Sequence, residues 1–95
     1  MNQELIRIVD NIARDKNIDR ESIFQDLEAA MVSAIRKHFG LKELDSEITV
    51  TIDRNNGTIR AYKDAEEIDI RRLGRIPAQT AKQVMIQKLK ADERD

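Results

Sequence analysis

The sequence has no cysteine and only one histidine, His38. Disulfides, a thiolate nucleophile and cysteine-ligated zinc are therefore excluded, and a single histidine cannot build a multi-histidine metal site. Aromatic residues are almost as scarce, because Phe24, Phe39 and Tyr62 are the only three. A surface on which bases stack, as single-strand RNA binders use, is not favoured by so few rings. The sequence predicts no metal and no other cofactor.

The sequence also lacks a charge excess and a long apolar run. It carries 17 basic and 18 acidic residues, for a net charge of −1, so charge alone predicts neither nucleic-acid wrapping nor membrane adhesion. No uncharged run approaches the roughly 18 residues of a membrane span, and the start is unlike a signal peptide. We expect a cytoplasmic protein with no membrane partner, forming one small domain over residues 1–95.

No group of titratable residues has the pattern of an active site. The acidic pairs at residues 66–67 and 92–93 lie in highly charged surroundings typical of a solvated surface. His38 ends a predicted helix and has no fixed carboxylate partner, so a catalytic triad is not supported. The sequence predicts a non-enzymatic protein with no small-molecule substrate.

The first half of the chain has the periodicity of two helices. Apolar residues at helical spacing predict a first helix over about residues 3–15. Asp19 is placed as the N-cap of a second helix, because Ile18 before it and Ile23 after it have the spacing of a hydrophobic staple. Gly40 is placed to end this helix in the left-handed conformation.

A long third helix is predicted near the C-terminus, over about residues 76–93. Pro77 fits its first turn, where the missing N–H costs nothing. Its apolar residues recur at three- and four-residue spacing and form one stripe, which comprises Ile76, Ala81, Val84, Met85 and Leu89.

A β-hairpin is predicted between the second and third helices. Residues 48–52 alternate apolar and polar side chains, and Asn56-Gly57 has the composition of a type I′ turn. A two-residue turn there pairs Ile52 with Ala61 and Arg54 with Ile59. The charged stretch 64–72 is either a short third strand or a linker. The predicted fold is α+β, with two N-terminal helices and one long C-terminal helix packed on a small antiparallel sheet.

Two basic clusters flank the predicted sheet in sequence. The first closes the second helix, with Arg36, Lys37 and His38, and the second precedes the last helix, with Arg71, Arg72 and Arg75. Cations at a helix C-terminus complement the helix dipole, which is one interpretation of the first cluster. The other is that the two clusters meet in space and bind phosphates. The sequence leaves both interpretations open.

Three blocks of this sequence resemble one known family. The first is residues 13–40, with an Ile-Asp-Arg-Glu helix entry followed by Leu-Glu-Ala-Ala. The second is the hairpin at residues 48–62, and the third is residues 74–88, where Gln79-Thr80-Ala81-Lys82-Gln83-Val84 is the most specific run. Together they closely resemble the N-terminal domain of the bacterial transcription factor NusA.

The chain departs from the family pattern in three places. Only Lys63 to Leu73 joins the hairpin to the last helix, where typical members have a longer stretch. Pro77 stands where alanine or threonine is common. The family continues after the last helix into an OB-fold domain and two KH domains that are missing from this sequence. Either this is an excised domain or the reading of RNA sequence has been lost.

The resemblance implies a transcription elongation factor domain that binds bacterial RNA polymerase near the β flap tip and the RNA exit channel, and modulates pausing, termination and antitermination. It places Arg36, Lys37, His38 and Arg75 beside the nascent RNA hairpin. The polymerase contact is expected on exposed residues of the second helix and on nearby parts of the same domain. The alternative is a small RNA- or ribosome-associated binding module that uses the basic clusters alone.

Overall fold

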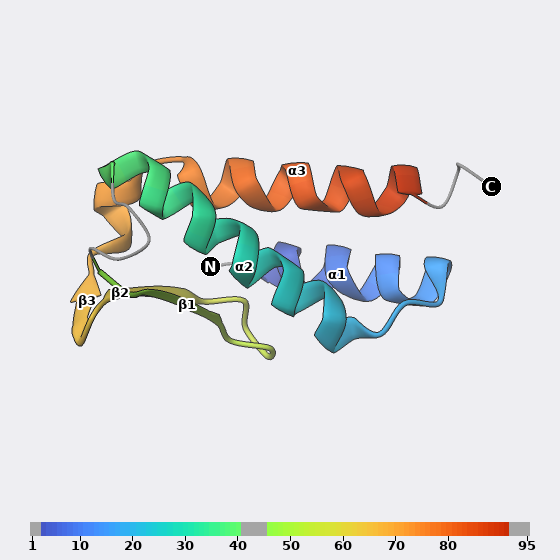
Figure 1. Cartoon of the computed structure of the whole chain (residues 1–95). Coiled ribbons are helices and arrows are strands. Elements are labelled where there is room, and N and C mark those ends of the chain that lie inside the picture. Colours follow the sequence, from blue (N-terminus) through green and yellow to red (C-terminus); the bar gives the residue numbers. More distant parts are fainter. Residues whose placement is uncertain (1–2, 41–45, 92–95) are drawn as a thin grey trace.

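The computed structural model describes residues 3–40 and 46–91, with side chains described as far as residue 88. The elements run in the order α1 (Gln3–Lys16), α2 (Arg20–Phe39), β1 (Ile48–Ile52), β2 (Ile59–Lys63), β3 (Glu66–Ile68), the 3₁₀ helix η1 (Ile70–Leu73) and α3 (Ile76–Ala91). The strands form an antiparallel sheet in the order β1-β2-β3. Helix α2 lies diagonally over the sheet and packs against α3 on its other side (Figure 1). The predicted α+β fold is confirmed.

Helix α2 begins and ends where the sequence predicts. The Asp19 carboxylate accepts a hydrogen bond from the backbone N–H of Glu21 at 3.2 Å, which satisfies a donor that the first helical turn leaves open. Gly40 has a φ of 67° and donates its N–H to the carbonyls of Arg36 and Lys37. Both ends of this helix are thus set by local residues.

The other two helices also match the prediction closely. Helix α1 ends at Lys16, and Asn17 follows with a φ of 55°, a left-handed conformation that asparagine tolerates better than most residues. Helix α3 begins at Ile76 with Pro77 buried in its first turn. The last predicted residues of this helix, 92–93, and the side chain of Leu89 lie outside the described residues.

The β1–β2 loop differs from the predicted two-residue turn. Ile52 pairs with Ile59 and Val50 pairs with Ala61, so the predicted pairings of Ile52 with Ala61 and of Arg54 with Ile59 are wrong. The loop spans residues 53–58, and only its Gly57 has a positive φ, of 78°. A shift of two residues leaves the same side chains on the same face, which is why the apolar pattern fits both registers.

Asp53 is the reason for the wider loop. Its carboxylate accepts hydrogen bonds from the backbone N–H groups of Asn55 at 2.7 Å and Asn56 at 3.0 Å, and its carbonyl accepts one from Gly57 at 2.8 Å. Aspartate side chains commonly form such turns with the backbone two residues on. These hydrogen bonds stabilise the wider loop in place of the predicted two-residue turn.

The charged stretch after the hairpin forms a third strand rather than a linker. β3 pairs with β2, and Ala61 lies opposite Ile68. Asp64, with a φ of 56°, makes the sharp turn between the two strands. Its carboxylate also accepts a hydrogen bond from the backbone N–H of Glu47 at 3.1 Å, which ties the turn to the start of β1.

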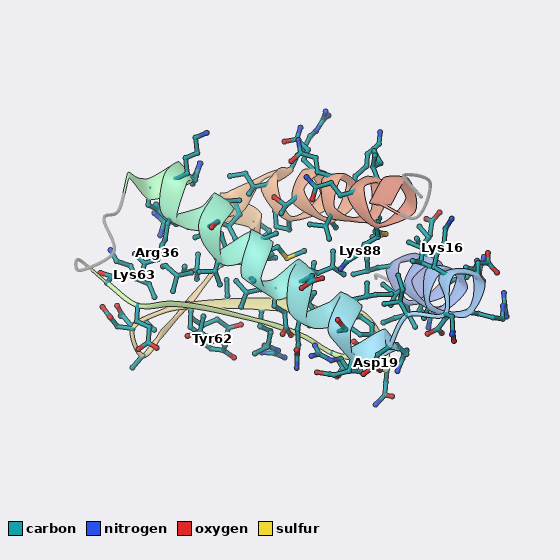
Figure 2. All side chains as sticks on the ribbon, turned by 45° about the vertical axis from the view of Figure 1, so that its right-hand side comes forward. Lys16, Asp19, Arg36, Tyr62, Lys63 and Lys88 are labelled. Atoms are coloured by element: carbon teal, nitrogen blue, oxygen red, sulfur yellow. The ribbon has the colours of Figure 1, made fainter. Side chains whose placement is uncertain are left out.

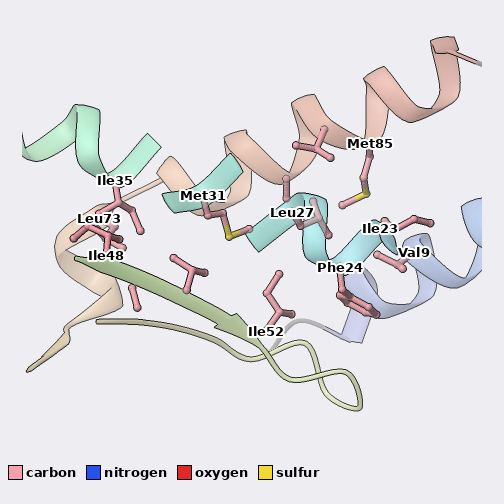
Figure 3. Close-up of a cluster of buried hydrophobic side chains, with 14 of the residues drawn as sticks. Val9, Ile23, Phe24, Leu27, Met31, Ile35, Ile48, Ile52, Leu73 and Met85 are labelled. Atoms are coloured by element: carbon pink, nitrogen blue, oxygen red, sulfur yellow. The ribbon is translucent and has the colours of Figure 1, made fainter. Parts of the chain in front are cut away.

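The hydrophobic core lies around α2. Phe24, Leu27 and Ile23 are fully buried between the sheet and the helices α1 and α3 (Figure 3). The sheet contributes alternate residues of β1, namely Ile48, Val50 and Ile52. Among the described residues, every fully buried side-chain nitrogen or oxygen atom has a hydrogen-bond partner.

Arg54 fastens the β1–β2 loop to α2. Its guanidinium contacts Glu21 at 2.6 Å and Glu28 at 2.5 Å, and Glu28 also accepts a hydrogen bond from the backbone N–H of Ile52 at 2.9 Å. The same guanidinium lies over the ring of Phe24, 4.8 Å from its centroid. The loop is therefore held by charge pairing and by a cation–π contact.

Two carboxylates of this region have lowered pKa values. Hydrogen bonds from Arg54 lower the pKa of Glu21, and backbone hydrogen bonds from Asn55 and Asn56 lower the pKa of Asp53. A carboxylate whose folded pKa lies below its unfolded value contributes stability above the unfolded pKa. That contribution is lost as the pH falls through the folded pKa.

We expect acidification to destabilise the domain in a defined window. The thermal unfolding midpoint should hold steady near neutral pH and fall below about pH 4.5, the usual range of these carboxylates. The variant Asp53→Asn lacks one titrating group but keeps an acceptor oxygen. On acidification, its thermal unfolding midpoint should therefore fall less than that of the parent chain. Circular dichroism melts across pH measure this. A variant as acid-sensitive as the parent chain would contradict the role of Asp53.

Candidate functional site

The structure brings the two basic clusters of the sequence to one end of the domain. Ile35, in the last turns of α2, and Leu73, at the end of η1, are both 1% exposed and lie together beside Ile48 (Figure 3). The residues that follow Ile35 and those on either side of Leu73 therefore surround the same corner. We call this the basic corner, formed by Arg36, Lys37, His38 and Arg75, and Arg71 and Arg72 lie on η1 beside it.

Arg36 also has a structural contact within the basic corner. Its guanidinium donates a hydrogen bond to the backbone carbonyl of Ser46, so it joins the end of α2 to the chain just before β1. Figure 2 shows its side chain directed toward that side of the molecule, where Lys63 ends β2. Lys37 and His38 are exposed, and the His38 ring packs edge-on against Phe39 at 5.0 Å.

Arg71 is neutralised by a neighbour, unlike Arg72. Arg71 forms a bidentate pair with Asp69, with its closest contact at 2.8 Å, and hydrogen bonds from Arg71 lower the pKa of Asp69. Arg72 and Arg75 are both exposed and have no hydrogen-bond or ion-pair partner through their side chains among the described residues. Two unpaired guanidinium groups therefore flank the buried Leu73.

An apolar groove is the second surface feature, and it lies between α1, η1 and α3. It has a volume of about 890 Å³ and opens to solvent. Three large aliphatic side chains are exposed among the described residues, and all three line this groove: Ile8 at 37%, Ile70 at 36% and Ile86 at 40%. Its floor contains Ile12, Pro77, Ala81 and Met85. We call it the apolar groove.

Sequence reasoning missed this groove. From the sequence, the polymerase contact is expected on the second helix, which does not line the groove. The available signal was Ile86, a large aliphatic residue outside the apolar stripe of the third helix. Such a residue is exposed unless a partner covers it.

Over residues 3–40 and 46–91, no three histidine or acidic side chains are grouped so that they could hold a metal ion. No described helix has both the length and the apolar character needed to cross a membrane.

Comparison with known proteins agrees with the fold and with the sequence blocks. A family model described as the NusA N-terminal domain matches residues 4–66 and 61–95. These two segments overlap at residues 61–66, within the hairpin and at the start of the short connection to the last helix. Nearly the whole chain is thereby matched.

Curated relatives carry the same family name. The chain is 27% identical, over 99% of its length, to the transcription termination/antitermination protein NusA of Halalkalibacterium halodurans, and equally identical to that of Bacillus subtilis. It covers 32% and 33% of these proteins. The chain thus spans about a third of the length of the curated relatives it matches.

A solved structure shares the fold. The solution structure of the N-terminal domain of NusA from B. subtilis matches with a TM-score of 0.78 and 25% identity, over the full length of both chains. The helices, the antiparallel sheet and the sequence blocks therefore all agree with one family. The chain belongs to the NusA N-terminal domain family.

Proposed function

We propose that this chain is a non-enzymatic domain that binds bacterial RNA polymerase in the cytoplasm, near the β flap tip and the RNA exit channel. There it adjusts pausing, termination and antitermination. Family membership supports a role in transcription, since the curated relatives are termination/antitermination proteins. The apolar groove is the observation that carries the docking part of the proposal.

The apolar groove has the properties of a protein docking surface. Exposed apolar patches on a small domain are costly unless a partner covers them, and here the three exposed isoleucines converge on one recess. Amphipathic helices are commonly bound by grooves of this kind, through apolar residues spaced along one face. We assign the polymerase contact to the groove, in place of the α2 surface that the sequence favours.

The basic corner supports the RNA part of the proposal. Arg36, Lys37, His38 and Arg75 lie at the end of the domain where α2 ends and α3 begins (Figure 1). Paired RNA presents its phosphates and 2′-hydroxyls rather than its base edges, so charge and shape suffice to contact a hairpin. Among the described residues of the corner, Phe39 beside His38 is the one phenylalanine or tyrosine ring. One ring does not form a platform on which several unpaired bases could stack.

Binding to purified core RNA polymerase after RNase treatment tests this proposal against the alternative. A polymerase-docking domain retains its binding when RNA is digested. A small RNA- or ribosome-associated module, which uses the basic corner alone, loses it. Loss of binding on RNase treatment would therefore favour the alternative and contradict the proposed docking.

Charge reversal in the basic corner should separate RNA contact from docking. We expect the double variant Lys37→Glu and Arg75→Glu to lose most of its enhancement of hairpin-stabilised pausing, because like charges then face the RNA phosphates. Its binding to RNase-treated polymerase should stay within about threefold of the parent chain, since exposed charges outside the groove contribute little. In vitro pausing assays and polymerase titrations measure the two effects.

Arg14→Glu provides the matched control. Arg14 is exposed near the end of α1, at the opposite end of the domain from η1 (Figure 1). This variant reverses one charge, as each of the single variants Lys37→Glu and Arg75→Glu does, and it should leave pausing unchanged. Equal loss of pausing in Arg14→Glu and in the two single variants would show that only the net charge matters.

A further inference from the structure

We infer that Arg72 is an additional phosphate-contacting residue, which extends the RNA-binding surface of the basic corner from α2 and α3 onto η1. This inference rests on the proposed function and names a position beyond Arg36, Lys37, His38 and Arg75. It depends on three features of η1: a buried anchor, a neutralised neighbour and an unpaired guanidinium.

The anchor is Leu73. Its side chain is 1% exposed and packs beside Ile35 and Ile48, which holds the backbone of η1 against the end of α2 (Figure 3). Asp69 caps the other end of η1 by accepting a hydrogen bond from the backbone N–H of Arg71 at 3.0 Å. The backbone that carries Arg72 is therefore held at both ends.

η1 separates the two surface features of the domain. Ile70 and Arg71 line the apolar groove, whereas Arg72 does not. In a 3₁₀ helix, with three residues per turn, consecutive side chains point about 120° apart. Arg72 is therefore directed away from both the groove and the position of Arg71.

Arg71 is hydrogen-bonded to Asp69, whereas Arg72 helps to lower the pKa of that carboxyl only through space and keeps its N–H donors open. The Asp69 carboxylate pairs with Arg71 through contacts at 3.1 Å, 3.3 Å and 2.8 Å. Arg72 is exposed and has no side-chain partner among the described residues. A guanidinium can bind a phosphate through two parallel hydrogen bonds, so Arg72 has the chemistry to add a contact beside Arg75.

Single variants test the inference. The chain binds a stalled polymerase complex whose RNA forms a hairpin in the exit channel, and its affinity is measured over a range of salt concentrations. The affinity for the same complex without a hairpin is the reference. We expect Arg72→Gln to reduce the hairpin-dependent slope of log affinity against log salt by about 1, the change typical of losing one phosphate contact. Arg60→Gln is the control, because Arg60 pairs with Glu67 at 3.4 Å and does not line the apolar groove. It should leave the slope unchanged.

The outcomes distinguish this inference from the proposed function. If Lys37→Gln and Arg75→Gln reduce the slope and Arg72→Gln does not, the inference is wrong but the RNA contact of the basic corner stands. If Arg72→Gln and Arg60→Gln reduce the slope equally, the distinction between paired and unpaired arginines is wrong. If none of the four changes alters the slope, both the inference and the proposed RNA contact are overturned.

Discussion

Ile86→Asp is expected to weaken binding of this chain to core RNA polymerase by at least about tenfold, because the substitution places a carboxylate in the apolar groove. Burying a charge without a partner costs several kcal/mol, and the apolar contact of the isoleucine is lost as well. The fold should tolerate the change, since Ile86 is 40% exposed. Titration of labelled chain against RNase-treated polymerase measures the effect.

A neighbouring residue and the opposite wall of the groove provide the controls. Gln87→Asp adds the same charge one residue further along α3, at an exposed position that does not line the groove, and should bind within about twofold of the parent chain. Ile8→Asp, on α1, should weaken binding as Ile86→Asp does. If both groove variants bound like Gln87→Asp, the groove would not be the docking surface.

Phe24→Ala should have the largest effect on stability. The ring is 0% exposed in the core, and deletion of a buried phenylalanine side chain commonly costs about 3–5 kcal/mol. The guanidinium groups of Arg20 and Arg54 also lie over this ring, at 5.1 Å and 4.8 Å from its centroid. A small domain has a total stability of only about 5–15 kcal/mol, so this one substitution should remove a large share of it.

Urea denaturation monitored by circular dichroism measures this loss. Phe39→Ala serves as the control, because Phe39 is only partly buried and packs at the edge of the core. It should cost less than half as much free energy as Phe24→Ala. Equal costs for the two variants would contradict the central position assigned to Phe24.

The helix ends could be predicted because local residues determine them. Asp19 and Gly40 act on their own helix through hydrogen bonds to backbone groups a few residues away. The periodic apolar residues between them then place the buried face of α2. Short-range chemistry of this kind is visible in a sequence without knowledge of the fold.

The hairpin register was not predicted, because one of its determinants is distant in sequence and the other, the turn that Asp53 makes, competes with the Asn56-Gly57 signal. Arg54 leaves the strand to pair with Glu21 and Glu28 on α2, and Asp53 makes its hydrogen bonds only in the wider loop. The Asn56-Gly57 signal favours a tight turn, but the same apolar face is buried in either register. The tertiary contacts of Arg54 and the local turn of Asp53 together favour the observed register.

The residues of the basic corner could be predicted from the sequence, but their arrangement could not. Both basic clusters are evident in the sequence, whereas their meeting depends on the packing of Leu73 beside Ile35. The apolar groove arises from the relative placement of α1, η1 and α3, which no local pattern specifies. Ile86 lies outside the apolar stripe of its helix. That it belongs to a groove is evident only in the structure, where it lines the same recess as Ile8 and Ile70.

The most direct test of the proposed function compares the affinity of this chain for two RNase-treated core polymerases, one intact and one lacking the tip of the β flap. The proposal predicts that the intact enzyme binds and that deletion of the flap tip abolishes binding. Equal binding to both enzymes would place the docking site elsewhere on polymerase, and no binding to either would contradict polymerase docking by this chain.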